Sequence, residues 1–458
     1  MSSAIKNIAV IGAGVTGLTA AYRLQTSGHQ VTVFEKSARP GGVVQSDTAG
    51  GYLWESGPNS MQENDPRQLA LFSELGLDSD KTYASPAARN RFVVRDSRPV
   101  PIPMSPLGLL ATPLFSAGAK FRLLGELFCR RQARTQDLSL ADFVRAHFGQ
   151  EILDYAINPL VAGVYAGDPE KLSTRCYTFP PLWELEARHG SIIRGQLALA
   201  KARKASGGMR SHLLSFRRGL QMLPDALAAK LGAALLTEAT IETLRPGSPW
   251  QITWSRGGTT TTSAFDAVVL ALPAGGLSRL PFGGAGECPL SSLAEVEHPP
   301  VTSLFLGFHR QQVVHPLNGF GALVPAVEKK HILGVLFSST LFPERAPADH
   351  VALTVFIGGS RQPGLTRRDP ADLMPLVLDD LRSLFRISGS PVFQRQVTWP
   401  HAIPQYNLGY EHHLEAIAQA ERDYPGLWIG GQARDGIGLG QCLLAGLRLA
   451  ESAGRLTV

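Results

Sequence analysis

Apolar runs of strand length alternate with a stretch of helical spacing at the start of the chain. Residues 7–11 form a short, mostly apolar run, and residues 18–27 repeat apolar side chains at helical spacing up to Gly28. A second apolar run, residues 30–34, ends at Glu35. This order predicts a β-α-β unit with two parallel strands.

Similar patterns predict two further groups of strands. The first group includes residues 266–271 and 427–429, and an apolar helix is expected over residues 443–453. A helix is also expected to open within residues 216–224. The second group alternates apolar with other residues and predicts a sheet that forms one wall of a pocket; it comprises residues 302–308, 332–337 and 351–357.

Residues 99–119 carry no charged side chain. A transmembrane helix needs roughly twenty apolar residues, so the length would suit one. We reject a spanning helix because prolines this dense break a helix and leave backbone groups unpaired in lipid; they are Pro99, Pro101, Pro103, Pro106 and Pro113. The segment predicts either a surface that enters one leaflet or the buried wall of a substrate channel, and basic residues follow it: Lys120, Arg122, Arg130, Arg131 and Arg134.

The composition is that of a folded protein with two or three domains. The chain has 458 residues, of which 44% are hydrophobic and 18% charged. We expect a reducing compartment, no disulfide and no metal site, because the cysteines are isolated: Cys129, Cys176, Cys288 and Cys442. The N-terminus shows no targeting signal, so we expect a cytoplasmic protein or one bound to a membrane from that side.

The chain is basic, with a formal net charge of +6. Residues 188–218 include no acidic residue and many arginines and lysines, Arg210 among them. Such a stretch is typical of a solvated helix face and also of a surface that contacts anionic lipid or an acidic ligand. No nucleic-acid-binding module is recognisable, so no nucleic-acid partner is expected.

A glycine motif lies between the first strand and the first helix. Gly12 permits the tight turn, Gly14 lets the backbone approach a pyrophosphate, and Gly17 lets the helix pack against the sheet. The amide groups at the helix start, which include those of Val15 and Thr16, then meet the phosphates. Glu35 ends the second strand, where a carboxylate can accept hydrogen bonds from ribose hydroxyls. The motif predicts a dinucleotide site.

The continuation after Glu35 resembles the second signature of FAD-containing amine-oxidase-like flavoproteins. That signature runs through Lys36, Arg39, Gly41 and Gly42. The resemblance implies that FAD is the cofactor and that the C-terminal glycines pass near the flavin ring. It also implies that Ile241 meets the adenine; the expected C-terminal contacts are Gly431, Gly436, Ile437 and Gly438.

Several segments away from these motifs resemble the protoporphyrinogen oxidase family, and the resemblance covers essentially the whole chain. They are residues 55–60, 90–92, 158–168, 319–325, 333–339, 358–360 and 403–406. The resemblance implies that Arg91 pairs with a substrate propionate and that small residues around Gly163 lie near flavin and substrate. It also implies that three apolar residues sandwich the tetrapyrrole, namely Leu323, Leu336 and Phe356, and that further FAD contacts come from Gly57, Pro58, Asn59 and Trp399.

The physical chemistry of a porphyrinogen agrees with these residues, because a large apolar ring with carboxylates needs an apolar slot and a fixed cation. No residue is nominated as a catalytic base. His189, His331 and His401 are interpreted as structural or surface histidines. The alternative for Arg91 is a surface arginine, and for the three apolar residues a plain core.

The expected architecture is α/β, and α+β overall, with a discontinuous Rossmann-like FAD-binding domain, a mixed-sheet substrate domain and a helical membrane-associating domain. We assign residues 1–85, 208–279 and 405–458 to the first, 86–95 and 280–404 to the second, and 96–207 to the third.

The resemblance implies a six-electron oxidation of protoporphyrinogen IX to protoporphyrin IX, with dioxygen as acceptor and hydrogen peroxide released. Peripheral association with the inner face of the cell membrane is expected; a homodimer and hand-over of product to a chelatase are further options. Three alternatives stay open. They are coproporphyrinogen III oxidation by the same chemistry, a flavin amine or carotenoid oxidoreductase, and a non-catalytic flavin-binding porphyrin carrier.

Overall fold

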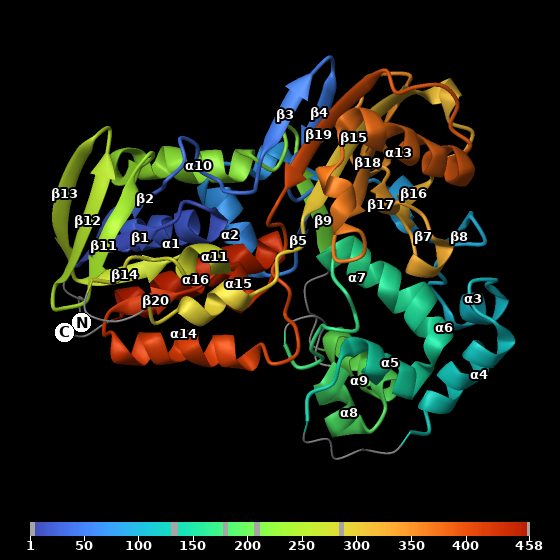
Figure 1. Cartoon of the computed structure of the whole chain (residues 1–458), viewed down its shortest axis with the longest axis horizontal. Coiled ribbons are helices and arrows are strands. Elements are labelled where there is room, and N and C mark those ends of the chain that lie inside the picture. Colours follow the sequence, from blue (N-terminus) through green and yellow to red (C-terminus); the bar gives the residue numbers. More distant parts are fainter. Residues whose placement is uncertain (1–4, 130–135, 177–181, 206–210, 284–287, 456–458) are drawn as a thin grey trace.

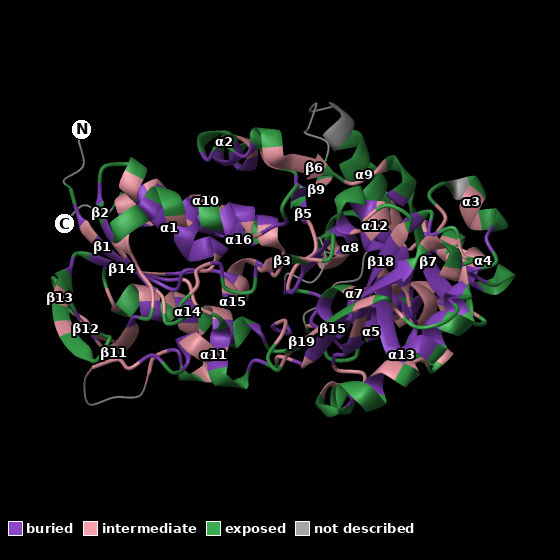
Figure 2. Ribbon diagram, turned by 90° about the horizontal axis from the view of Figure 1, so that it is seen from above, coloured by how far each residue is buried: buried purple, intermediate pink, exposed green. Residues whose placement is uncertain are grey.

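The computed structural model describes residues 5–129, 136–176, 182–205, 211–283 and 288–455 (Figure 1). Two sheet-based lobes share the molecule, and a helical region lies beside the second (Figure 1). Buried residues concentrate in the sheets and in the helices that cover them (Figure 2). Arg130, Arg131, Arg134 and Arg210, which the sequence analysis names as basic neighbours, lie outside the described residues.

A parallel sheet forms the centre of the first lobe, with the strand order β10-β2-β1-β14-β20. Its strands are β1 (Asn7–Ile11), β2 (Gln30–Phe34), β10 (Leu235–Leu236), β14 (Ala267–Leu270) and β20 (Leu427–Ile429). The predicted β-α-β unit is confirmed, since β1 pairs in parallel with β2. The last strand returns to the same sheet beside β14, so both ends of the chain build this lobe.

Apolar layers cover both faces of this sheet, as a parallel sheet requires. Ile8 and Val10 face one core, whereas Ala9 and Ile11 face the other. The first core is shared with α1 (Val15–Thr26), α10 (Met222–Leu231) and α16 (Leu439–Gly454). The second is closed by α14 (Glu411–Asp423), η5 (Ser291–Glu295) and an antiparallel sheet of β11 (Thr240–Arg245), β12 (Trp250–Arg256) and β13 (Thr259–Phe265).

The second lobe is a seven-stranded mixed sheet with the order β19-β15-β18-β17-β16-β7-β8. The bounds are β7 (Asn90–Arg95), β8 (Arg98–Pro101), β15 (Val301–His309), β16 (Gly319–Leu323), β17 (Ile332–Leu336), β18 (His350–Gly358) and β19 (Phe393–Trp399). The three strands predicted here are confirmed as β15, β17 and β18. Helix α13 (Pro370–Phe385) packs Val377 and Leu381 against Val335 and Val355 on one face.

The helical region follows β8 and consists of short helices. They are α3 (Pro106–Ala111), α4 (Ala117–Glu126), α5 (Leu140–Phe148), α6 (Gln150–Ile152), α7 (Asn158–Tyr165), α8 (Leu182–His189) and α9 (Ile192–Ala205). None of the helices in the described ranges is both long and apolar enough to cross a membrane.

Smaller elements connect the lobes. They comprise a hairpin, a three-stranded sheet and one helix, which lie between the lobes in the chain or at their junction. The hairpin is β3 (Ser46–Ala49)–β4 (Tyr52–Glu55), the sheet is β5 (Met61–Glu63)–β9 (His212–Phe216)–β6 (Lys81–Tyr83), and the helix is α2 (Pro66–Glu74).

Two sequence expectations differ from the structure in detail. The helix expected within residues 216–224 begins only at Met222, because Phe216 ends β9, where it is fully buried. Residues 98–101 were assigned to the helical domain, yet as β8 they pair with β7 and extend the second sheet. The pairing is antiparallel and leaves β8 at the sheet edge, which is where Pro99 and Pro101 are tolerated.

Candidate active site

Three glycines at the junction of β1 and α1 form a backbone turn that we call the cradle: Gly12, Gly14 and Gly17. Each glycine is required for a different reason. Gly12 has φ +101°, and a Cβ there would lie 2.6 Å from the carbonyl oxygen of Ala271. A Cβ on Gly17 would lie 1.9 Å from the carbonyl oxygen of Gly12. Packing therefore demands glycine at both positions. Gly14 differs, because a Cβ there would meet nothing within 4 Å. The open space beside Gly14 is where a bound group can reach the backbone.

The start of α1 is built to meet an anion. The helix has no side-chain cap at Gly14 and no acidic residue in its first turn. Its first amide groups, which belong to Val15, Thr16 and Gly17, carry the positive end of the helix dipole. Thr16 contributes backbone rather than side chain, because its hydroxyl donates to the carbonyl oxygen of Cys442 at 3.0 Å.

Glu35 lies directly across the glycine turn. Its Oε2 accepts a hydrogen bond of 2.8 Å from the amide of Ala13, and its Oε1 accepts one of 2.9 Å from the amide of Ser37. These bonds fix the carboxylate at the end of β2 and leave further lone pairs for ribose hydroxyls. Lys36, the next residue, is exposed. Ile241 lies on β11, close to Glu35 in the fold, because Ala239, the residue before this strand, donates its amide to the Glu35 carbonyl oxygen at 2.8 Å.

Arg39 holds the second glycine segment in shape. Its guanidinium donates to the carbonyl oxygens of Val44 at 2.9 Å and Gly42 at 3.0 Å, and to the side chain of Gln221 at 2.6 Å. Gly41 and Gly42 have φ values of +104° and +58°. The Gly41 amide donates to the carbonyl oxygen of Ala13 at 2.7 Å, which places this loop beside the phosphate cradle.

Residues 57–59 run between that loop and the second sheet. A Cβ on Gly57 would lie 1.9 Å from the carbonyl oxygen of Val43, so the two segments touch. Asn59 reaches the sheet, accepting a bond of 3.4 Å from the Thr354 hydroxyl, and Pro58 precedes it in the chain. At the end of β19, the indole of Trp399 donates to the carbonyl oxygen of Ser56 at 2.7 Å.

The C-terminal glycine segment returns to the cradle. Gly431 and Gly436 have φ values of +108° and +101°, and a Cβ on Gly431 would lie 3.7 Å from the Thr16 hydroxyl. Gly438 caps α16 after Ile437, and the bond from Thr16 to Cys442 joins the starts of α1 and α16. Burial raises the pKa of the Cys442 thiol to about 12, so this cysteine is no nucleophile at neutral pH.

These observations fit a dinucleotide with a flavin. The open side of Gly14, the uncapped start of α1 and the fixed carboxylate of Glu35 lie at one end of the parallel sheet. The segments around Gly41, Gly57 and Gly431 extend the same surface toward the second sheet. The structure thus brings together the cofactor-binding residues expected from the N-terminal and C-terminal motifs.

An apolar wall lies on the second sheet, on the face that carries Thr354, whose hydroxyl bonds to Asn59 beside the cradle segments. Leu323 pairs with Gly334, which pairs with Phe356, and Leu336 follows two residues after Gly334 on β17. Because side chains alternate along a strand, the three apolar residues share one face of the sheet. All three are half-buried, and this is the face opposite to α13. A plain core would bury them fully.

Helix α7 crosses this face, and its Gly163 meets the wall. A Cβ on Gly163 would lie 2.3 Å from Cδ2 of Leu323. The following loop is held by β18, since the Ser360 amide donates to the carbonyl oxygen of Ala166 at 2.7 Å. Two segments that the sequence resemblance singles out, residues 158–168 and 358–360, therefore touch in the structure.

Arg91 lies at the edge of the wall. It is exposed and its guanidinium stands 5.4 Å from the ring of Phe320. Phe320 packs in a cluster with Leu336. Arg91 is therefore beside the apolar wall and open to solvent, which suits a cation that meets a carboxylate at the rim of a slot.

Two arginines of this region, Arg361 and Arg345, were not predicted from the sequence to have a structural role. Arg361 donates to the carbonyl oxygen of Val324 at 2.7 Å and to Asn158 at 3.0 Å, so it ties α7 to the sheet. Burial lowers its pKa to about 10. Arg345 forms a buried ion pair with Glu55 at 2.8 Å and joins the two lobes. The Gly-Gly-Ser segment just before Arg361 could have drawn attention to that residue, whereas no local motif marks Arg345.

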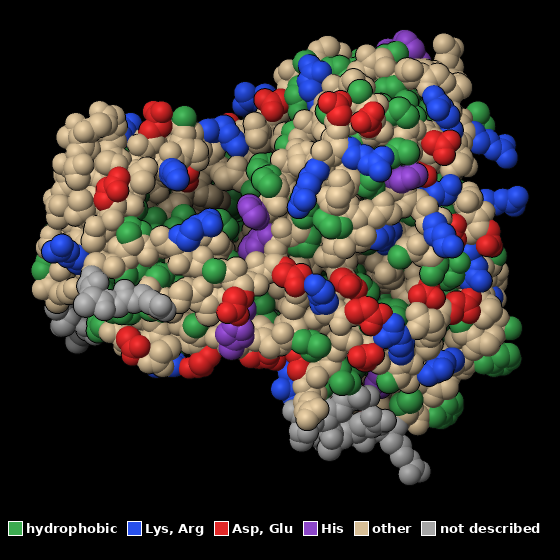
Figure 3. Space-filling model, viewed as in Figure 1, with side chains coloured by type: hydrophobic (Ala, Val, Ile, Leu, Met, Phe, Trp, Pro, Cys, Tyr) green, Lys and Arg blue, Asp and Glu red, His purple; other side chains and the backbone are tan. Residues whose placement is uncertain are grey.

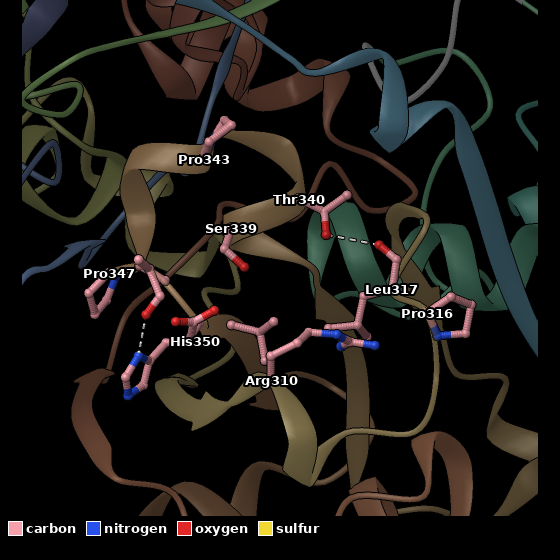
Figure 4. Close-up of a pocket in the computed structure, with 12 residues that line it drawn as sticks. Arg310, Pro316, Leu317, Ser339, Thr340, Pro343, Pro347 and His350 are labelled. Atoms are coloured by element: carbon pink, nitrogen blue, oxygen red, sulfur yellow. Dashed lines mark hydrogen bonds between the residues drawn. The ribbon is translucent and has the colours of Figure 1, made fainter.

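A depression of about 490 Å³ elsewhere on the second lobe is not this site (Figure 4). Its lining includes Arg310, Leu317, Thr340 and His350, and none of the expected site residues. The Thr340 hydroxyl donates to the carbonyl oxygen of Leu317 at 2.8 Å across it (Figure 4).

Comparison with known proteins agrees with the geometry. The family model of flavin containing amine oxidoreductases matches residues 15–453. The chain is 34% identical to protoporphyrinogen oxidase 2 of Arabidopsis thaliana, over 97% of this chain and 93% of that protein. It is 27% identical to coproporphyrinogen III oxidase of Bacillus subtilis (strain 168), over 99% of each chain.

A solved structure from Exiguobacterium sp. 255-15, named as a candidate protoporphyrinogen oxidase, superimposes with a TM-score of 0.80. The identity is 22%, over 99% of each chain, so this likeness shows the fold. Together with the cradle, the comparisons establish an FAD-dependent oxidoreductase. The chain belongs to the flavin containing amine oxidoreductases and, among them, to the protoporphyrinogen oxidase family.

Proposed function

We propose that the protein oxidises protoporphyrinogen IX to protoporphyrin IX in tetrapyrrole biosynthesis, with dioxygen as the acceptor. The reaction removes six electrons and six protons, and three molecules of dioxygen leave as three of hydrogen peroxide. The observation that supports the substrate assignment is the half-buried wall of Leu323, Leu336 and Phe356, which shares one face of the second sheet with Thr354, the partner of Asn59.

The chain's own part in this chemistry is binding and orientation. The wall packs against one face of the tetrapyrrole, and Gly163 leaves room where α7 crosses it. Arg91 pairs with a propionate at the rim, where a guanidinium can bind a carboxylate with two hydrogen bonds. Bound FAD supplies a two-electron hydride acceptor.

The protons that leave the porphyrinogen are accepted by solvent or by the cofactor. The wall residues are apolar, and a polar residue on the same face is engaged, since the Thr354 hydroxyl bonds to Asn59 and to Ser338. His331, one of the histidines interpreted as structural or surface residues, lies beside Asp380 of α13, on the other face of the sheet.

Coproporphyrinogen III is the second candidate substrate, favoured by the 27% identity to the Bacillus subtilis oxidase over the whole chain. That substrate carries four propionates and needs more cations around the slot. Purified holoenzyme should be given each porphyrinogen in air while porphyrin fluorescence and peroxide are recorded. We expect faster turnover of protoporphyrinogen; a preference for coproporphyrinogen would reverse the assignment.

We also propose that the helical region docks on the inner face of the cell membrane. Large apolar side chains are exposed on it, with Leu107 at 79%, Phe121 at 73% and Phe128 at 83%. Hydrophobic side chains gather over α3 and α4 (Figure 3). Such a patch on a soluble monomer would be unusual.

The two cations of α4 are already used internally. Lys120 donates to the carbonyl oxygens of Leu110 and Thr112, and Arg122 to that of Arg145. Insertion of apolar side chains should therefore outweigh attraction to anionic lipid. Flotation with vesicles should survive high salt and fail for Phe121→Ser/Phe128→Ser; loss of wild-type flotation in salt would contradict this. Two further options stay part of this proposal: the product is released to a chelatase, and the protein forms a homodimer.

A further inference from the structure

A histidine pair and a glutamate lie together on the outer side of the FAD-binding lobe. They are His412 and His413, at the start of α14, and Glu295, at the end of η5. One ligand atom from each residue lies within 4.8 Å of the other two. Histidine and acidic side chains appear side by side over α14 (Figure 3). The FAD site and the apolar wall use none of these residues.

His412 is oriented to present a lone pair. Its Nδ1 donates a hydrogen bond of 2.6 Å to the carbonyl oxygen of Gly409. In the neutral ring, Nε2 is then unprotonated and can coordinate. Nε2 lies 3.6 Å from Oε2 of Glu295. An electron pair and a carboxylate oxygen thus face each other, an arrangement that a cation between them stabilises.

His413 supplies a buried third group. Its side chain is only 5% exposed, and its Nδ1 is buried without a hydrogen-bond partner among the residues the structure describes. A buried polar nitrogen with no partner is costly, so such groups call for an explanation. Its ring packs edge-on against Tyr410, with centroids 5.1 Å apart, which holds it in place.

The spacing suits a first-row transition metal. Ligands at about 2.0–2.1 Å from a tetrahedral Zn²⁺ lie roughly 3.3 Å apart, close to the observed separation of Nε2 and the carboxylate oxygen. Two imidazoles with one carboxylate match the preferences of Zn²⁺, Ni²⁺ and Co²⁺ better than those of Mg²⁺ or Ca²⁺. The side chains of His412 and Glu295 are 55% and 72% exposed, so an ion can enter from solvent.

We propose that Glu295, His412 and His413 form a binding site for a divalent transition metal of the Zn²⁺ class, with water completing the coordination. The ion joins η5 to α14. Tyr410, at the start of the same helix, donates from its hydroxyl to the carbonyl oxygen of Ala433 at 2.8 Å. The site therefore braces the segment between Gly431 and Gly436 that borders the flavin. It is independent of the proposed substrate.

The sequence expectation of no metal site rested on the isolated cysteines. That expectation did not consider the adjacent His412 and His413, and Glu295 lies more than a hundred residues earlier in the chain. Only the packing of η5 against α14 brings the three together.

The test is Zn²⁺ binding to purified FAD-loaded protein, measured by competition with a chromogenic chelator. Wild type should bind one Zn²⁺ per chain at micromolar concentration or tighter. His412→Ala and Glu295→Gln, both at exposed side chains, should each weaken binding at least tenfold. His350→Ala removes one member of a surface histidine pair, whose rings lie 4.5 Å apart, and should bind as wild type does.

A second readout uses Co²⁺, whose ligand-field bands lie to the red of the flavin absorption. Intense bands typical of four-coordinate Co²⁺ should appear in wild type and disappear in His412→Ala. Absence of stoichiometric Zn²⁺ binding in wild type, or equal affinity in wild type, His412→Ala and Glu295→Gln, would overturn the proposal.

Discussion

Gly163 on α7 lies against Leu323 on β16 so closely that a Cβ on residue 163 would be 2.3 Å from Cδ2 of the leucine. The atom in the way is the end of a flexible side chain, so the leucine can rotate. We propose that the leucine would rotate into the substrate slot in front of the apolar wall, and that the glycine thereby sets the width of this slot.

Gly163→Ala should narrow the slot while the fold survives. We expect the free energy of unfolding to fall by about 1–3 kcal/mol, the usual cost of overpacking. We expect kcat/KM for protoporphyrinogen to fall roughly tenfold, about 1.4 kcal/mol. Adding Leu323→Val should return part of the lost activity, because the two sites share one space. Strictly additive losses in the double variant would show that the residues do not act on a common slot.

Gly14 and Gly17 should respond differently to alanine. At Gly14 the added Cβ meets nothing in the protein and φ is −70°, so the apoprotein should keep its Tm. FAD affinity should fall at least tenfold, or about 1.4 kcal/mol. At Gly17 the Cβ would lie 1.9 Å from a backbone oxygen, so the apoprotein itself should be destabilised. Calorimetry of both apoproteins and FAD titration make the comparison; normal FAD affinity in Gly14→Ala would contradict the cradle.

Arg91→Ala should raise KM for protoporphyrinogen by roughly tenfold or more, since a charge-assisted hydrogen bond contributes about 1.5–3 kcal/mol. The effect on kcat should be small, because the guanidinium lies at the rim. Arg89→Ala is the matched control, an exposed arginine two residues earlier that precedes the strand. Steady-state kinetics of the two variants decide; equal KM values would remove Arg91 from substrate binding.

The helical region should lose stability in acid through Glu126. Burial alone would raise the pKa of this carboxyl, but the His147 ring 3.4 Å away and hydrogen bonds from Ser191 and the amides of Ile192 and Ile193 outweigh it and lower the pKa. A lowered folded-state pKa adds stability above the unfolded-state pKa, about 4.3 for glutamate, and that stability is lost as pH falls through the folded-state value. Glu126→Gln should therefore be less stable than wild type at neutral pH, with a smaller further loss in acid.

Thermal unfolding followed between neutral pH and the acid range measures this difference. Glu184→Gln serves as control, since Glu184 is an exposed acid on α8 of the same region. The control should follow the wild-type pH profile. A Glu126→Gln profile parallel to wild type would contradict the role given to the carboxylate.

The sequence could predict the cradle because its chemistry is local. Gly12, Gly14, Gly17 and Glu35 lie within one β-α-β unit, so their spacing alone implies their geometry. The wall is different. Leu323, Leu336 and Phe356 come from three strands, and only the register of the sheet places them on one face. Their role came from family resemblance, not from periodicity.

Local sequence patterns could not predict contacts between segments that are distant in the chain. Arg345 and Glu55 are buried together although 290 residues separate them, and nothing near either residue signals the pair. No strand was expected at residues 98–101, and the edge position of β8 is what accommodates its prolines.

The proposed reaction requires that the flavin of this protein takes electrons directly from protoporphyrinogen. The direct measurement is anaerobic mixing of oxidised holoenzyme with protoporphyrinogen, with flavin absorbance and porphyrin fluorescence recorded together. We expect the flavin absorbance to bleach in step with the rise in porphyrin fluorescence, and air to restore the absorbance. A flavin that stays oxidised while fluorescence rises no faster than without enzyme would contradict the proposed reaction.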